Sequence, residues 1–256
     1  MTKSVLLTVN VHGLGPEAVN APEEHLFGRL AHGRYTYRIG LSRVLDAMRT
    51  WDVRATFFWP VFEAERCGSL FERCIADGHE IGSHGQSFES LSSLGDREAE
   101  VLERACDRLE QLCGTRPAGF RSPDGTVSYA TLSHLRRLGY LYDSSFVDDD
   151  FPYLLDEDGA PGMVELPLFE GLTDATHFSR LLTQERVEAF FNEELDALLS
   201  ESGYACLTLH PRADKGIGRA ARLPLVERLL QRARDSGGQI VTGREFAEHY
   251  LKRRAL

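Results

Sequence analysis

Short apolar segments alternate with amphipathic helices along almost the whole chain, and this alternation constrains the fold more than any other feature of the sequence. Segments such as Ala55–Pro60 are rich in β-branched and aromatic residues, as buried strands are. The segment Asp96–Leu112 has the period of an amphipathic helix and is followed by Gly114, a favourable residue at a helix C-terminus. Repeated strand–helix units predict a mainly parallel sheet, open or closed into a barrel, with helices outside it.

The other segments continue this alternation, and we expect a single domain over residues 1–256. Further strands are predicted at Val5–Val11, Glu80–Ser83, Gly119–Ser122, Leu141–Asp143, Val164–Pro167, Tyr204–His210 and Gln239–Val241. Further helices are predicted at Tyr37–Trp51, Ser69–Ala76, Ser128–Leu138, Gln184–Ser200, Arg222–Asp235 and Gly243–Lys252. The segment Phe146–Gly162 is rich in Asp, Pro and Gly, which predicts a long loop.

Composition and charge narrow the possible partners and the cellular location. The chain is 42% hydrophobic, which is enough for one large core, and its net charge of −10 argues against a nucleic-acid partner. The apolar run Val5–Val9 is too short for a signal peptide or a membrane span, so we expect a cytoplasmic protein with no membrane contact. The odd number of five cysteines favours free, buried thiols.

Polar side chains gather where the predicted strands end. In parallel α/β folds the functional site lies at the carboxyl ends of the strands, so these residues are expected to meet there. They are Asn10, His12, His84, Arg121, Asp143 and His210.

The segment Gly78–Glu89 almost forms a metal site. His84 lies on a turn flanked by Gly and Ser, but Phe88 stands four residues later, where a second imidazole would complete a pair. A phenyl ring has no lone pair to donate to a metal, so a hydrolytic metal would lose a ligand here.

Six stretches of the chain, taken in order, resemble the polysaccharide deacetylase superfamily of carbohydrate esterases, which shares the NodB homology fold. They are Leu7–Gly13, Arg54–Phe58, Gly78–Gly85, Gly119–Pro123, Gly139–Ser145 and Leu207–Pro211. The resemblance implies an α/β fold, an irregular (β/α)7-type barrel.

The resemblance also implies which residues stand at the family's catalytic positions. The family's general base is an aspartate, and a second aspartate and two histidines bind its metal. The resemblance places Asn10, His12, His84 and Phe88 at these four positions, so only His84 is retained. An asparagine cannot accept a proton at neutral pH.

A branch with similar replacements contains metal-independent allantoinases and cyclic-imide hydrolases, which the chain also resembles in Asp149–Tyr153 and Tyr35–Arg43. The allantoinase-like relatives assemble as oligomers, which makes a homo-oligomer an expectation for this chain.

Individual roles follow from residue chemistry. His12 or His84 is a candidate base and His210 a candidate acid for a leaving nitrogen, with Asn10 near the oxyanion. A guanidinium at Arg121 can orient a carboxylate. Asp143 is expected to hold Arg121 or to tune His210. The candidate substrate contacts are Asp143, Asp150, Phe88, Trp59 and Asp174.

Three functions remain open from the sequence. The first is hydrolysis of a non-peptide C–N bond in a small linear or cyclic amide or imide, with no cofactor. The second is a zinc-dependent N-deacetylase or deformylase of an amino sugar or biosynthetic intermediate, with His12, His84 and Glu89 as ligands. The third is a ligand-binding pseudoenzyme that does no chemistry.

Overall fold

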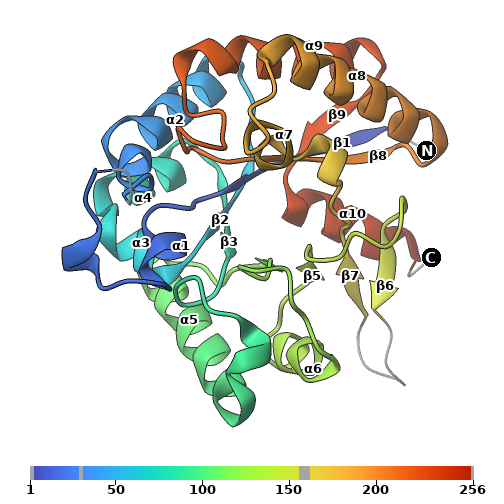
Figure 1. Cartoon of the computed structure of the whole chain (residues 1–256). Coiled ribbons are helices and arrows are strands. Elements are labelled where there is room, and N and C mark those ends of the chain that lie inside the picture. Colours follow the sequence, from blue (N-terminus) through green and yellow to red (C-terminus); the bar gives the residue numbers. More distant parts are fainter. Residues whose placement is uncertain (1–2, 29–30, 156–161, 255–256) are drawn as a thin grey trace.

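The computed structural model describes residues 3–28, 31–155 and 162–254 (Figure 1). Its described strands form one nine-stranded sheet, in the order β6, β7, β5, β4, β3, β2, β1 and β8, with β9 beside β1. Their bounds are β1 Ser4–Asn10, β2 Thr56–Trp59, β3 Glu80–Ser83, β4 Gly119–Phe120, β5 Tyr142–Asp143, β6 Tyr153–Leu155, β7 Met163–Glu165, β8 Tyr204–Leu209 and β9 Gln239–Val241.

Strand β1 pairs with three other strands, and these pairings explain why distant parts of the chain meet at its end. On one side, β8 pairs with it in parallel from Ser4 to Val9. On the other side, β9 pairs with Ser4–Leu6 and β2 pairs with Thr8–Asn10. The carboxyl end of β1 therefore lies between the carboxyl ends of β2 and β8.

The sheet curls into a half-barrel, which confirms the predicted α/β barrel-like fold. A single parallel bridge between Thr173 and Thr208 brings the chain after β7 alongside β8, so the curl is nearly closed. Strand β6 is antiparallel to β7, whereas the other strand pairs are parallel. The prediction of one loop over Phe146–Gly162 was wrong at β6, where Tyr153–Leu155 pairs with Met163–Glu165; the part over residues 156–161 lies outside the described residues.

Most of the long α-helices, among them α2, α5, α8 and α9, lie around the outside of the curled sheet, whereas α10 lies within its arc in this view (Figure 1). The bounds of the α-helices are α1 Gly15–Ala18, α2 Leu41–Thr50, α3 Val61–Arg66, α4 Gly68–Ala76, α5 Glu98–Cys113, α6 Tyr129–Arg137, α7 Asp174–Phe178, α8 Gln184–Glu201, α9 Leu223–Asp235 and α10 Gly243–Arg254. Short 3₁₀ turns lie at Glu23–His25, Leu91–Ser93, Gly95–Arg97, Glu170–Leu172 and Ala220–Arg222.

Local signals set several helix ends as expected. Gly114 adopts the left-handed conformation after α5, and Ser128 caps α6 by accepting from the backbone of Thr131. The helix expected over Tyr37–Trp51 instead begins with a π-helical turn, Thr36–Gly40. A Cβ on Gly40 would lie 1.8 Å from the carbonyl oxygen of Pro211, so glycine lets the chain after β8 pack closely here.

The core lies between the sheet and the helices, and strands β1, β2 and β8 are almost wholly buried in it. All five cysteines are free, as expected, and four are buried. None of the helices in the described ranges is both long enough and apolar enough to cross a membrane.

Candidate active site

Five of the expected polar residues come together at the carboxyl ends of the strands. They are Asn10, His12, His84, Arg121 and His210, and each is less than 9% exposed. Asn10 is the last residue of β1, and the other four follow β1, β3, β4 and β8. Because these strands run in parallel, their ends deliver side chains from distant parts of the sequence to one place.

The first feature of the site is a contact between two histidines. The Nε2 atoms of His12 and His84 are 2.9 Å apart, and the ring planes differ by only 8°. The Nδ1 of His84 donates to the carbonyl oxygen of Arg121 at 2.7 Å, because a carbonyl can only accept. A neutral His84 therefore has its lone pair on Nε2, and it accepts the Nε2–H of His12.

This pairing leaves the Nδ1 of His12 with a lone pair. That atom is buried and has no hydrogen-bond partner among the described residues. Burial, followed by the neighbouring His210 and His84, lowers the pKa of His12 well below its usual value. Burial likewise lowers the pKa of His84 to about 3. Both rings are therefore neutral at pH 7, and one basic nitrogen remains unused.

The second feature is a buried histidine–carboxylate pair. The Nδ1 of His210 donates to Oδ1 of Asp174 at 2.6 Å. The other oxygen of Asp174 accepts the backbone N–H groups of His210 and Ile217, at 2.8 and 2.9 Å. Asp174, which the sequence placed among the candidate substrate contacts, is fully buried and holds the ring of His210. The ring of His210 lies 4.9 Å from that of His12, centre to centre.

Arg121 orients the side chain of Asn10 through a hydrogen bond. Its Nη1 donates to Oδ1 of Asn10 at 2.9 Å, which turns the amide nitrogen of Asn10 toward Nε2 of His210, 3.4 Å away. The other guanidinium contacts are neutral oxygens and a sulfur, from Thr8, Ser144 and Cys206. The expectation that Asp143 holds Arg121 was therefore wrong, since no carboxylate is among these contacts.

Asp143 pairs instead with Glu165, which the sequence reasoning missed. The two carboxyls end the neighbouring strands β5 and β7, are partners in register and are fully buried. Burial raises the pKa of Asp143 to about 6, and burial together with Asp143 raises that of Glu165 well above its usual value. Two carboxyls this close share a proton, since both cannot ionise without strong repulsion. An acidic residue inside the apolar run Met163–Leu166 was the available signal.

Of the three remaining candidate substrate contacts, only Phe88 lies at the site. Phe88 is at the site, with its ring edge-on to His12 at 4.9 Å. Trp59 is fully buried and packs edge-on against Phe71, so it belongs to the core and not to a pocket wall. Asp150 is exposed on the segment before β6, and no described contact links it to the histidines.

The zinc-binding set does not assemble. Nε2 of His12 and Nε2 of His84 face each other at hydrogen-bond distance, so their lone pairs do not converge on a third point. Both oxygens of Glu89 accept hydrogen bonds from the loop at Gln86 and Ser87. No cluster of three or more His, Cys, Asp or Glu side chains suited to a metal occurs within the described ranges.

A buried glutamate holds the loop that carries His12, and the sequence reasoning also missed it. Oε1 of Glu63, on α3, accepts the backbone N–H groups of Gly13 and Gly15, at 3.0 and 2.9 Å. Its other oxygen accepts the hydroxyl of Tyr37 at 2.5 Å. An acidic residue at the fourth position after the buried strand β2 was the signal for this role.

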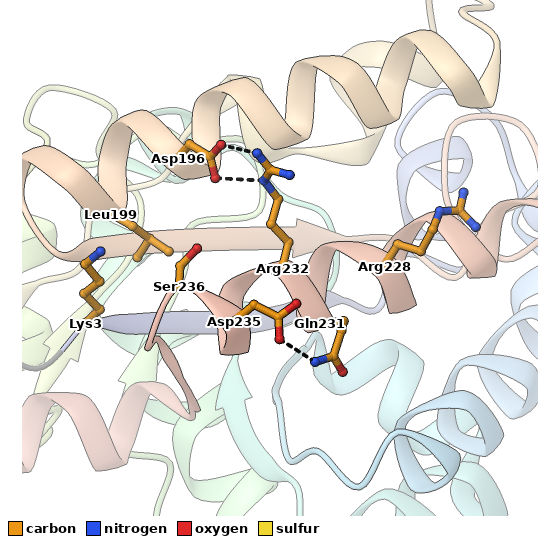
Figure 2. A pocket seen from close by; sticks show the side chains of 8 residues that line it. All are labelled: Lys3, Asp196, Leu199, Arg228, Gln231, Arg232, Asp235 and Ser236. Atoms are coloured by element: carbon orange, nitrogen blue, oxygen red, sulfur yellow. Dashed lines mark hydrogen bonds and ion pairs between the residues drawn. The ribbon is translucent and has the colours of Figure 1, made fainter.

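A surface pocket between α8 and α9 lies away from these residues. Figure 2 shows that it is lined mostly by polar side chains, among them Lys3, Asp196 and Arg232, with Arg232 and Asp196 in an ion pair. Lys3 precedes β1, at the end of the strand opposite to His12. None of the residues that line this pocket belongs to the candidate site.

Residues 37–142 match the family model described as polysaccharide deacetylase. This match covers less than half of the chain. The matched region contains His84, Phe88 and Arg121, whereas Asn10, His12 and His210 lie outside it.

The chain is similar to named proteins in sequence and in structure. A peptidoglycan deacetylase from Helicobacter pylori is 29% identical over 126 residues, which is 48% of this chain and 43% of that protein. The chain thus matches less than half the length of this curated relative. A crystal structure from Mycobacterium smegmatis that carries the name polysaccharide deacetylase has a TM-score of 0.89 at 28% identity, covering 100% of this chain and 93% of that one.

A second solved structure, of PuuE allantoinase, shares the fold. It has a TM-score of 0.81 at 23% identity and covers 96% of this chain and 89% of that one.

Proposed function

We propose that this polysaccharide deacetylase-family protein hydrolyses a non-peptide C–N bond in a small linear or cyclic amide or imide, through residues of the chain alone. The observation that carries the proposal is the free Nδ1 lone pair of His12, which lies beside the His210–Asp174 pair. A basic nitrogen next to a histidine that is oriented by a carboxylate is an arrangement suited to moving protons in both directions.

In the proposed reaction His12 is the general base. Its Nδ1 takes a proton from water as the water oxygen attacks the substrate carbonyl carbon. The resulting imidazolium keeps its Nε2–H bond to Nε2 of His84, which fixes the tautomer and shares the charge. His84 has no free lone pair of its own, so we assign it to positioning His12.

His210 is the general acid. Protonated on Nε2, with Nδ1–H held by Asp174, it gives its Nε2 proton to the departing nitrogen as the C–N bond breaks. In the structure the amide N–H of Asn10 faces the lone pair on Nε2 of His210. When that nitrogen is protonated, it can no longer accept, and the amide N–H of Asn10 is available to donate to the developing oxyanion. The products are a carboxylic acid and an amine, or one ring-opened molecule when the substrate is cyclic.

The family's usual aspartate–histidine–histidine metal site has no counterpart in these residues, so no step is assigned to a metal. Asn10, His12 and Phe88 occupy the positions at which the resemblance places a base and two ligands. The contact between His12 and His84 uses the two nitrogens that a metal would need.

The test is turnover of a panel of cyclic imides, hydantoins, N-acyl amines and acetylated amino sugars, with metal analysis of the same protein before and after chelation. We expect hydrolysis of an amide or imide that survives chelation and is lost in His12→Ala. Stoichiometric zinc whose removal abolishes turnover would establish the metal-dependent deacetylase instead. Tight binding of a panel compound without turnover would establish a binding protein.

A further inference from the structure

The segment between β8 and α9, residues 211–222, carries an excess of positive charge in an acidic chain. It contains Arg212, Lys215, Arg219 and Arg222 but only one acid, Asp214, whereas the whole chain has a net charge of −10. A local excess of one sign beside a site raises the concentration of ligands of the opposite sign.

This segment folds back over the acid half of the candidate site. A Cβ on Gly216 would lie 2.1 Å from the carbonyl oxygen of His210, so the backbone passes directly against that residue. The backbone N–H of Ile217 donates to Asp174 at 2.9 Å. Lys215 immediately precedes these two contacts, and its position in the chain is therefore fixed beside the site.

One cation of the segment is neutralised and the others are not. Arg212 is buried and pairs with Glu17 at 2.6 Å and with Asp214 at 2.9 Å. Within the described residues no carboxylate lies within ion-pair distance of Lys215, Arg219 or Arg222. Arg222 donates instead to the carbonyl oxygens of Ala213 and Gly216.

The ammonium of Lys215 has no direct ion pair among the described residues, and only the more distant carboxylates of Asp214, Glu17 and Asp174 oppose the lowering of its pKa. The same ammonium is among the charges that lower the pKa of His12, after burial and the two other histidines. Burial, followed by Arg212, lowers the pKa of Lys215 itself. The acids nearest to it are already bonded, Asp214 and Glu17 to Arg212 and Asp174 to His210. Lys215 is thus a half-buried cation that has no anion of its own.

We propose that Lys215 binds an anionic group of the substrate, so that the site selects small amides or imides that also carry a carboxylate. The identity of the reacting group rests on the proposed function, but the recognition of an anion does not. The compact ammonium of a lysine suits a single carboxylate approached from one side. The selectivity of this site for charged small molecules then comes from the loop after β8.

The experiment is isothermal titration calorimetry with two probes of nearly the same size, N-acetylglycine and its neutral amide N-acetylglycinamide. We expect wild-type protein to bind N-acetylglycine at least tenfold more tightly than the amide. Lys215→Gln should weaken N-acetylglycine binding by about 10- to 100-fold and leave binding of the amide unchanged. Lys215→Arg keeps the charge and should retain most of the preference.

The matched control is Lys3→Gln, which removes a lysine at the opposite end of β1 (Figure 2) and should leave both affinities unchanged. Thermal denaturation of Lys215→Gln should match wild type, because the residue has no ion pair to lose. Equal affinity of the wild type for the two probes, no binding of either, or an unchanged preference in Lys215→Gln would each overturn the proposal.

The result is independent of turnover. Binding of N-acetylglycine through Lys215 without hydrolysis of any panel compound would reject the proposed function and retain this inference. Hydrolysis of neutral amides with no preference for the carboxylate would do the reverse.

Discussion

The pairs His12–His84 and His210–Asp174 differ in the group that is hydrogen-bonded to His12 or His210. His210 is backed by the carboxylate of Asp174, which also accepts two backbone N–H groups. His12 is backed by the neutral imidazole of His84, and the Nδ1 of that ring is bonded to a backbone carbonyl. A carboxylate stabilises a protonated ring, whereas a neutral acceptor only fixes the tautomer. This difference is the basis for the proposed general acid at His210 and the proposed general base at His12.

The largest expected effect tests the base side. His12→Ala should lower kcat/KM by about 10³- to 10⁴-fold, because it removes the unpartnered nitrogen that accepts the proton. His84→Ala should have a smaller effect, since it removes only the partner that orients His12. Steady-state kinetics of both variants makes the comparison, with the exposed His25→Ala as a control. A larger loss in His84→Ala than in His12→Ala would reverse the two roles.

The acid side is tested by Asp174→Asn, for which we expect a loss of about 10²- to 10³-fold in kcat. An asparagine keeps the size of the side chain but removes the negative charge and places an NH₂ group near one of its hydrogen-bond donors. The measurement is kcat and KM as a function of pH. Asp196→Asn, in the pocket between α8 and α9, is the control. A pH profile and a kcat that match wild type would show that Asp174 does not act through His210.

A third prediction concerns the Asp143–Glu165 pair, whose carboxyls differ from Asp174 in having a raised pKa. Because the folded-state pKa of Asp143 is about 6 and its ordinary value is 3.8, the folded protein holds a proton that the unfolded chain releases. The contribution of this group to the free energy of unfolding should therefore be fully present below pH 4, and about 3 kcal/mol of it should be lost as pH rises through 6.

Urea unfolding between pH 4 and pH 7 measures this decrease. Asp143→Asn should flatten the pH dependence, whereas Asp150→Asn, which removes an exposed aspartate, should keep it. Two results together would exclude a shared proton at this pair. They are a wild-type free energy of unfolding that rises with pH over this interval, and an equal decrease of that free energy in the two variants.

The smallest expected effect is at Phe88, which only contacts the edge of the His12 ring. Phe88→Leu keeps an apolar neighbour and loses an aromatic contact worth about 1 kcal/mol, so kcat/KM should fall by about fivefold. Kinetics should show the change in kcat, because the contact orients the base. A loss as large as that of His12→Ala would mean that Phe88 does more than support the ring.

Much of the fold was predictable because its signals are local. The apolar run of β1, the helix period of α5 and Gly114 at its end each depend on residues that are close in sequence. The strand β6 was missed because it has three residues in a segment of polar composition, and its pairing with β7 supplies what its own sequence does not. The π-helical turn before α2 likewise depends on Gly40 packing against the chain after β8.

The sequence by itself determined which side chains reach the carboxyl ends of the strands, since each follows a buried strand: Asn10, His12, His84, Arg121 and His210. Only the tertiary structure decided their partners. His12 and His84 are 72 residues apart, and His210 and Asp174 are 36 apart, so no local pattern records either contact. Strand order and side-chain direction set the distances between these residues. As a result, one nitrogen of His12, its Nδ1, is left without a hydrogen-bond partner.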